Sequence, residues 1–287
     1  MIRLAVRCAS DVADRVLPAL LELAPGGVEE EAGQGWVEYA VYGPRGEVPD
    51  VGELRAAAGD GLVEVTSTEI PDDWADRWRD FHRAVVIADR LCVRPAWDEA
   101  RGEGVDVEVV VDPGQAFGTG AHATTRMCLE LLLELADRGE AGGPLLDLGT
   151  GTGVLAIAAA KLGWAPVTGV DHERAALAAA AANAAVNGVE LDLERVNLRE
   201  EVPELAPTVA ANLTAPLLMA VADRLREPPR WLVASGVLQV EVERVEGAFA
   251  RRGLSVDERR ESGDWASLLL AGRVDANSRG QLDQQRR

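Results

Sequence analysis

Residues 145–153 read LLDLGTGTG, an apolar run that enters a loop with glycine at every second position. An alanine-rich segment with helical spacing follows, and a second apolar run, VTGVD at residues 167–171, ends in an acidic residue. Strand, glycine turn, helix, strand and acid in this order are typical of the nucleotide-binding half of a doubly wound α/β sheet. Asp171 stands about 20 residues beyond Gly149, the spacing at which such a carboxylate accepts hydrogen bonds from ribose hydroxyls. We therefore predict an adenosine-containing cofactor on the loop that contains Gly149 and Gly151.

The spacing of the glycines indicates which kind of cofactor is bound. A dinucleotide fingerprint is G-x-G-x-x-G/A, but the position of its third small residue is occupied here by Val154, and Gly153 comes one step earlier. The observed G-x-G-x-G loop, with Asp147 in the strand before it, resembles the first motif of Rossmann-like S-adenosylmethionine methyltransferases. Such enzymes bind no pyrophosphate, so they do not need the helix N-terminus after the loop for a phosphate. The alternative is a glycine loop that only turns the chain, which the strand, the helix and the distal acid argue against.

Length and composition bound the remaining possibilities. A chain of 287 residues with 47% hydrophobic residues can form one large domain or two modest ones. No apolar run is long enough to span a membrane, and the first residues predict a strand rather than a signal peptide, so we expect a cytoplasmic protein. The scattered cysteines are expected to be buried and reduced, and the histidines share no metal-ligand spacing with them, so no metal site is predicted. The cysteines are Cys8, Cys92 and Cys128, and the histidines are His82, His122 and His172.

The formal net charge of −19 bears on the partners. An acidic chain repels phosphate backbones, which argues against direct nucleic-acid binding, whereas a basic protein or a cationic substrate would be attracted. The alternative is that the charge serves only solubility. The chain contains a single lysine, Lys161, against many arginines. Separately, we expect the protein to act as a monomer.

The first 70 residues have the pattern of a small α+β domain. Short signals predict the order β-α-β-β-α-β of a ferredoxin-like fold, over residues 2–8, 11–23, 28–31, 36–41, 50–58 and 62–68. Nothing in this domain has a catalytic pattern, so recognition or oligomerisation is its expected task. Residues 71–100 are interpreted as a linker region, in which Trp74, Trp78 and Phe81 share one helical face. This face either anchors a short helix to a domain surface or forms a rim that faces the substrate.

Residues 101–272 are predicted to form one α/β domain, and residues 273–287 a disordered polar tail. The expected helices cover residues 125–135, 155–162, 174–186, 215–225 and 240–250. The expected strands cover residues 105–111, 145–148, 167–170, 191–196, 209–211, 231–235, 254–258 and 265–271. The predicted fold class is therefore α/β, with a doubly wound, mostly parallel Rossmann-like sheet and a small N-terminal ferredoxin-like α+β domain.

Two further segments contain candidate chemistry. Residues 112–125, DPGQAFGTGAHATT, are rich in glycine and hydroxyl groups and lie at a strand-to-helix junction, where loops usually contact ligands. The last two threonines, Thr124 and Thr125, either cap the next helix or contact the ligand. Residues 209–218, VAANLTAPLL, place Asn212 at the end of a strand, where its side-chain carbonyl can accept a hydrogen bond from a substrate amine. The alternative is that Asn212 is the N-cap of the next helix.

Taken together, these segments resemble the PrmA-type methyltransferases, which modify ribosomal protein L11 of the large subunit. The resemblance rests on D-P-G-x-A-F-G-T-G-x-H-x-T-T, D-x-G-x-G-x-G-x-L-A-I-A and A-N-L-T-A-P-L, and extends over residues 71–271. It implies transfer of methyl groups from S-adenosylmethionine to lysine side chains, to an N-terminal amine or to both, with the N-terminal domain reading the substrate. The chain departs from the family at Ala123, where proline is frequent, and at residues 213–215, where Leu-Thr-Ala replaces the common Ile-Leu-Ala.

The resemblance also implies roles for particular residues. Asn212 would orient the substrate amine, Phe117 would wall the pocket beside it, and Thr125 would hold the methionine end of the cofactor. By the family pattern, the cofactor contacts would fall on Thr125, Gly149, Asp171 and Asn212. The pattern of the glycine loop and of the strand before it adds Gly151 and Asp147 to the predicted cofactor site.

Three alternatives stay open. A relative that acts on another protein, such as the β subunit of electron-transfer flavoprotein, is disfavoured by the N-terminal domain. An NAD(P) dehydrogenase is disfavoured by Val154 and by the lack of a catalytic Tyr-Lys or His-Asp pair. A non-catalytic cofactor-binding module is disfavoured because residues 112–125 and the segment around Asn212 are intact.

Overall fold

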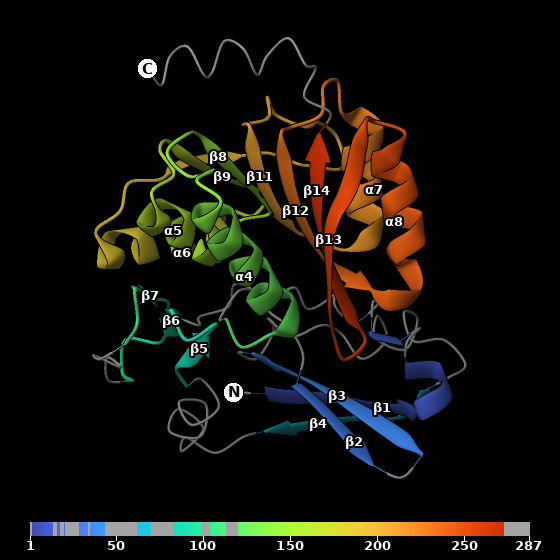
Figure 1. Ribbon diagram of the computed structural model, residues 1–287. Helices are drawn as coiled ribbons and strands as arrows, with labels where there is room; N and C mark the ends of the chain where they lie inside the picture. The colour runs from blue at the N-terminus through green and yellow to red at the C-terminus, as the bar shows by residue number, and fades with distance from the viewer. Residues whose placement is uncertain are drawn as a thin grey trace, which may run out of the picture. The chain divides into compact units, whose positions relative to one another are not determined.

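In the residues that it describes, the computed structural model contains three sheets, of four, seven and three strands, together with helices (Figure 1). One unit consists of residues 1–83 with 114–117, and the other of residues 84–113 with 118–287. The residues that the structure describes are 2–13, 16, 17, 20, 29–33, 35–43, 62–69, 83–98, 104–112 and 120–272.

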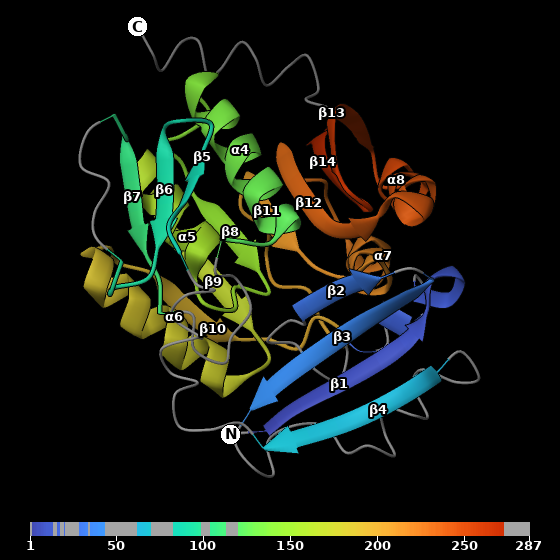
Figure 2. The same ribbon diagram turned by 90° about the horizontal axis from the view of Figure 1, so that it is seen from below.

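The four-stranded sheet belongs to the first unit and is antiparallel, with the order β2-β3-β1-β4 (Figure 2). Its strands are β1 (Ile2–Ala9), β2 (Glu29–Gly33), β3 (Trp36–Gly43) and β4 (Leu62–Glu69). This order matches the predicted ferredoxin-like fold. The first predicted helix, over residues 11–23, begins within the 3₁₀ turn η1 (Ser10–Val12). Beyond this turn its described residues are helical and buried: Ala13, Val16, Leu17 and Leu20. The second, expected over residues 50–58, lies outside the described residues.

A buried acid ties the two central strands of this sheet together. Glu38 of β3 is 8% exposed and lies opposite Arg7 of β1 in the strand register. Its carboxylate accepts hydrogen bonds from Arg3 at 2.7 Å and from Arg7 at 2.8 Å. Burial acts to raise the pKa of Glu38, but the two arginines outweigh it, so the pKa is lowered from its usual value. The carboxylate is therefore charged at neutral pH, which favours this register of β1 and β3.

The seven-stranded sheet of the second unit has the order β10-β9-β8-β11-β12-β14-β13. The first five strands in this order are parallel, whereas β14 and β13 are antiparallel to their neighbours. The strands are β8 (Leu145–Leu148), β9 (Val167–Asp171), β10 (Asp192–Arg195), β11 (Thr208–Asn212), β12 (Trp231–Leu238), β13 (Leu254–Ser262) and β14 (Trp265–Gly272). From β8 the chain runs outward through β9 to β10 and then returns to β11 on the other side, which confirms the predicted doubly wound class.

Two layers of helices cover this sheet (Figure 1). One layer contains α4 (Ala123–Asp137), α5 (Val154–Leu162) and α6 (Arg174–Asn187), and the other contains α7 (Ala215–Arg224) and α8 (Val242–Ala250). Strand side chains alternate between the layers, so Ala210 and Val233 pack with the first layer while Val209 and Leu232 pack with the second. The predicted helix over residues 240–250 begins as a 3₁₀ turn, η3 (Gln239–Glu241), before α8.

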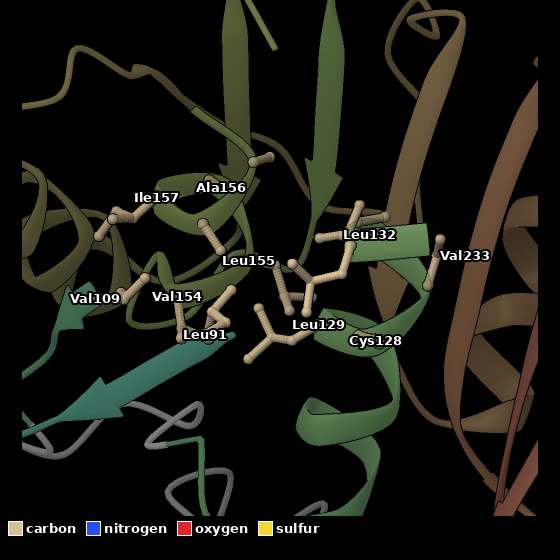
Figure 3. Close-up of a cluster of buried hydrophobic side chains, with 14 of the residues drawn as sticks. Leu91, Val109, Cys128, Leu129, Leu132, Val154, Leu155, Ala156, Ile157 and Val233 are labelled. Carbon is tan, nitrogen blue, oxygen red and sulfur yellow. The ribbon is translucent and has the colours of Figure 1, made fainter. Parts of the chain in front are cut away.

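A small three-stranded sheet packs outside the first helical layer (Figure 3). It consists of β5 (Val85–Ile87), β6 (Leu91–Arg94) and β7 (Val107–Val110), with β6 antiparallel to β5 and parallel to β7. Leu91 and Val109 are fully buried in one cluster with Leu129 of α4 and Val154 of α5. The sheet thus belongs to the core of the second unit, although β5 and β6 fall in the sequence region interpreted as a linker.

Lys161 joins the last turn of α5 to this sheet. Its Nζ donates a hydrogen bond to the backbone carbonyl of Glu108 in β7 at 2.7 Å. Partial burial lowers the pKa of the Lys161 ammonium, and the Glu108 carboxylate offsets part of that effect.

The described residues include all three cysteines of the chain. Cys8, Cys92 and Cys128 are buried free thiols, as predicted. The described residues contain no cluster of His, Cys, Asp and Glu with the arrangement of a metal site. None of the described helices combines the length and the apolar character needed to cross a bilayer.

Candidate functional site

The candidate site lies where the strand order of the large sheet reverses, at the carboxyl ends of β8, β9 and β11. In open α/β sheets, ligands bind in the crevice at this switch point. Gly149 follows β8, while Asp171 and Asn212 are the last residues of β9 and β11. Thr125 lies in the first turn of α4, within hydrogen-bond distance of Asn212. The structure therefore brings these four predicted residues together at the carboxyl ends of the central strands.

The loop after β8 is a tight turn built on three glycines with positive φ. The φ values are 74° at Gly149, 54° at Gly151 and 82° at Gly153, a region that side chains disfavour. A Cβ on Gly149 would lie 2.4 Å from the side chain of Leu213, and the Gly149 amide donates to the carbonyl of Val170 at 2.8 Å. Glycine thus lets the backbone approach both neighbouring strand ends more closely than another residue would.

Asp171 fixes the same loop from the end of β9. Its Oδ2 accepts a hydrogen bond from the Gly151 amide at 3.1 Å, and its Oδ1 accepts one from the Glu173 amide at 3.0 Å. The side chain is 11% exposed, and Nδ1 of the exposed His172 lies 3.3 Å from Oδ1. Because a carboxylate can accept about four hydrogen bonds, Asp171 keeps acceptor capacity for a ligand hydroxyl.

Asp147 lies beneath the loop, in the strand itself. It is 1% exposed, and its Oδ2 accepts a hydrogen bond from the hydroxyl of Thr150 at 2.8 Å. Burial raises the pKa of Asp147 to about 7; Thr150 and the Ala156 amide lower it in part, and the Asp171 charge raises it further. Its Oδ1 is buried and makes no hydrogen bond of good geometry to the described residues. One oxygen of this buried carboxylate is therefore less fully hydrogen-bonded than the other.

Asn212 and Thr125 form the polar pair on the other side of the loop. The Asn212 Nδ2 donates a hydrogen bond to Thr125 Oγ1 at 3.3 Å. Thr125 is fully buried, whereas Asn212 is half-buried. Because Nδ2 is used in this bond, the Asn212 Oδ1 is the atom free to accept a hydrogen bond from a ligand. The N-cap of α7 is Thr214, so the alternative in which Asn212 caps this helix is wrong.

A bulge in β12 supports Asn212 from the neighbouring strand. The β12–β14 register shifts between Ala234 and Val237, and Gly236 has a φ of 82°. A Cβ on Gly236 would lie 2.5 Å from the carbonyl oxygen of Leu213 and 3.1 Å from Oδ1 of Asn212. This glycine therefore leaves room for the turn that begins at Asn212.

His122 is the N-cap of α4, so the alternative in which Thr124 or Thr125 caps this helix is wrong. Its Nδ1 accepts a hydrogen bond from the Thr124 amide at 3.4 Å and lies 2.7 Å from Thr124 Oγ1. The ring packs edge-on against Trp265, with 5.0 Å between centroids. Burial lowers the pKa of His122 to about 4, and the positive charge of Arg126 adds to this effect. A neutral imidazole thus caps the helix and leaves Thr125 to face Asn212.

Comparison with known proteins identifies the family. A sequence profile described as "Ribosomal protein L11 methyltransferase (PrmA)" matches residues 51–272. The chain belongs to the ribosomal protein L11 methyltransferase family. The family member from Symbiobacterium thermophilum is 34% identical over 266 residues, which cover 87% of this chain and 84% of the relative. The member from Pelotomaculum thermopropionicum is 39% identical over 219 residues, 75% of this chain and 70% of the relative.

A solved structure from the family is also similar. The crystal structure of ribosomal protein L11 methylase from Lactobacillus delbrueckii subsp. bulgaricus aligns with a TM-score of 0.58 and 27% identity. The alignment covers 67% of this chain and all of that structure. These matches confirm the family resemblance that was drawn from the three sequence segments.

One predicted site residue lies outside the described residues, and one residue that supports the site was not predicted from the sequence. Phe117 lies outside the described residues, so its assignment to the pocket wall stays a prediction. Asn183 of α6 was not singled out, yet it is 3% exposed and donates a hydrogen bond to the carbonyl of Thr152 in the glycine loop. The signal that could have found it is a polar residue in the middle of an alanine-rich helix.

Proposed function

We propose that this chain transfers methyl groups from S-adenosylmethionine to amino groups of ribosomal protein L11, at lysine side chains, at the N-terminus or at both. The observation that carries the proposal is the Asn212–Thr125 pair, which lies beside the glycine loop and Asp171 at the switch point of the sheet. Membership of the family supports both the reaction and the substrate, because relatives are named for methyl transfer to L11.

The residues at this edge fit the cofactor. The glycine loop offers backbone without side chains, and Asp171 keeps acceptor capacity for ribose hydroxyls. The buried Oδ1 of Asp147 is an acceptor without a protein partner of good geometry among the described residues. We assign Gly149, Gly151 and Asp171 to the nucleoside and Asp147, Thr125 and Asn212 to the methionine side. When bound, S-adenosylmethionine supplies an electrophilic methyl group.

The chain's own residues bind and orient the substrate amine. Only a neutral amine has the lone pair that attack requires, and at pH 7 roughly one lysine in two thousand is neutral. The Oδ1 of Asn212 accepts a hydrogen bond from one N–H of this amine, which directs the lone pair toward the cofactor. Thr125 keeps the amide of Asn212 in the orientation that presents Oδ1. The rate gain therefore comes mainly from orientation, and the released proton passes to water.

The overall charge and the division of the chain suit a basic protein substrate. A net charge of −19 attracts a cationic partner and repels nucleic acid. Because the glycine loop, Asp171 and Asn212 all lie in the second unit, we assign substrate recognition to the ferredoxin-like unit. We further propose that the protein acts as a monomer in the cytoplasm, with neither nucleic acid nor a membrane as a partner.

One pair of measurements tests the function. Calorimetric titration with S-adenosylmethionine and separately with NAD should show binding of the former only. The intact mass of L11 incubated with enzyme and cofactor should then increase in steps of ~14 Da, one per methyl group. Binding without a mass change would remove L11 as the substrate, and binding of NAD would overturn the interpretation of the glycine loop.

A matched pair of variants tests the assigned site. Asn212→Ala should lower kcat about a hundredfold, because the amine loses its orientation, while the Kd for S-adenosylhomocysteine should rise by a smaller factor, because one contact to the methionine side is lost. Thr125→Val keeps the shape but removes the hydroxyl, so kcat should fall less, and the double variant should be no worse than Asn212→Ala. Fully additive losses would show that Thr125 does not act through Asn212.

A further inference from the structure

Two asparagines interrupt the alanine surface of α6. Asn183 and Asn187 are four residues apart and therefore lie on the same face, one turn from each other. Asn183 is 3% exposed, among the most buried polar residues of the described chain. A buried amide needs partners for both its carbonyl and its NH₂ group, so the positions to which Asn183 binds are informative.

The two ends of the Asn183 amide bind two different segments. Its Nδ2 donates a hydrogen bond to the carbonyl of Thr152, inside the glycine loop, at 2.9 Å. Its Oδ1 accepts a hydrogen bond from the backbone amide of Asp112 at 2.9 Å. Asp112 is the first residue of the glycine- and hydroxyl-rich segment 112–125, whose far end contains Thr125. One side chain therefore links the loop after β8 to the start of the segment that leads into α4.

Asn187 provides a comparison within the same helix. Its Oδ1 accepts from the Val110 amide at 2.9 Å, and its Nδ2 donates to the Val110 carbonyl at 2.6 Å. It thus holds the end of β7 in the manner of a neighbouring strand, and among the described residues it makes no hydrogen bond to the glycine loop. Asn187 and Asn183 share the task of holding the backbone after β7, and only Asn183 also holds Thr152.

We propose that Asn183 is a positioning residue that holds the glycine loop at Thr152 and the backbone at Asp112 in one fixed arrangement for the cofactor. The proposal rests on the proposed function for the identity of that cofactor. Asn183 does not need to touch the cofactor, because it acts through the carbonyl of Thr152, between Gly151 and Gly153. Loss of the amide should leave the fold in place but widen the range of positions that the loop adopts.

The test compares Asn183→Ala with Asn187→Ala in the full-length chain. Both variants lose bonds to the backbone around β7, so both should unfold at a lower temperature. Only Asn183→Ala should raise the Kd for S-adenosylhomocysteine, by about tenfold, and speed hydrogen exchange of the amides at residues 151–153. Equal Kd values for the two variants, or unchanged exchange in Asn183→Ala, would overturn the proposal.

A second variant covers the case in which Asn183→Ala does not fold. A protonated carboxylic acid has the donor and acceptor of an amide, so Asn183→Asp should exchange like wild type at residues 151–153 at low pH and faster as the acid ionises. At each pH the exchange rates of the variant are divided by those of wild type, and a ratio that stays constant with pH would contradict the proposed bond to Thr152. Because the exchange needs no cofactor, it tests Asn183 even if wild type binds no S-adenosylhomocysteine, a result that would refute the proposed function instead.

Discussion

At Asp171, one carboxylate serves both the loop and the ligand that the loop is proposed to bind. It accepts hydrogen bonds from the amides of Gly151 and Glu173, and it retains acceptor capacity at the edge of the sheet. A substitution here removes a contact and also releases the glycine loop.

We expect Asp171→Ala to weaken S-adenosylmethionine binding by a factor of about 10 to 150, equivalent to the ~1.5–3 kcal/mol of one charged hydrogen bond. Calorimetric titration measures this Kd. Glu173→Ala is the control, because Glu173 binds Asp171 through its backbone amide and its own side chain is more exposed. An unchanged Kd in Asp171→Ala would refute the assignment to the ribose.

Asp147 predicts a pH dependence of stability. Its pKa in the folded protein is raised to about 7, mainly by burial, whereas an unfolded aspartate titrates near 3.9. Between these two pKa values Asp147 holds a proton in the folded chain that it has released in the unfolded chain. The stabilisation that this proton gives to the fold is therefore complete below about pH 4 and is lost as the pH rises through about 7.

Urea unfolding of wild type and Asp147→Asn at pH 5 and pH 8 measures this contribution. The free energy of unfolding of wild type should fall relative to the variant by up to about 2.7 kcal/mol between these pH values, which is about 1.36 kcal/mol for each of the two pH units below the folded pKa, because asparagine does not titrate. A constant difference between the two proteins would show that Asp147 is ionised in the fold throughout this range.

At the scale of elements, the glycine loop and the strands beside it were predictable, whereas the contacts that support them were not. The alternating glycines, the distal acid and the apolar runs are local patterns, and they predicted β8, α5 and β9 closely. The bulge at Gly236 and the bond from Asn183 to Asp112 join residues that are distant in sequence, and no local pattern encodes such a pair. A threonine cap of α4 was one of two alternatives, because hydroxyl caps are common, but an imidazole nitrogen of His122 takes that place.

The bulge in β12 gives a prediction at this scale. Gly236→Ala places a methyl group 2.5 Å from the Leu213 carbonyl at a φ of 82°, so both a steric clash and backbone strain oppose it. We expect a loss of ~2–4 kcal/mol in unfolding free energy together with a lower kcat, because the turn at Asn212 must shift. Gly142→Ala is the control: Gly142 has a φ of 102° with nothing within 4 Å of its Cβ position, so it should show the strain without the clash. Equal losses in the two variants would contradict a close fit at Gly236.

At the scale of the whole molecule, the charge of −19 should act on the protein substrate and not on the cofactor. Attraction over distances beyond about 10 Å is screened at 0.1 M salt, so kcat/KM for L11 should fall by at least about tenfold between 0.05 and 0.5 M NaCl. The Kd for S-adenosylhomocysteine, measured in the same buffers, should change much less. A kcat/KM that does not depend on salt would mean that the acidic surface serves solubility.

Lys161 is the single lysine of the sequence, which affects how methyl transfer to a partner can be measured. The chain offers its own active site a single ε-amine, and that amine is bound to the Glu108 carbonyl at the end of α5. An enzyme that modifies amines therefore presents almost no competing acceptor of its own, apart from its N-terminus. Radioactive label that appears in a mixture of enzyme and partner can be attributed to the partner with little background correction.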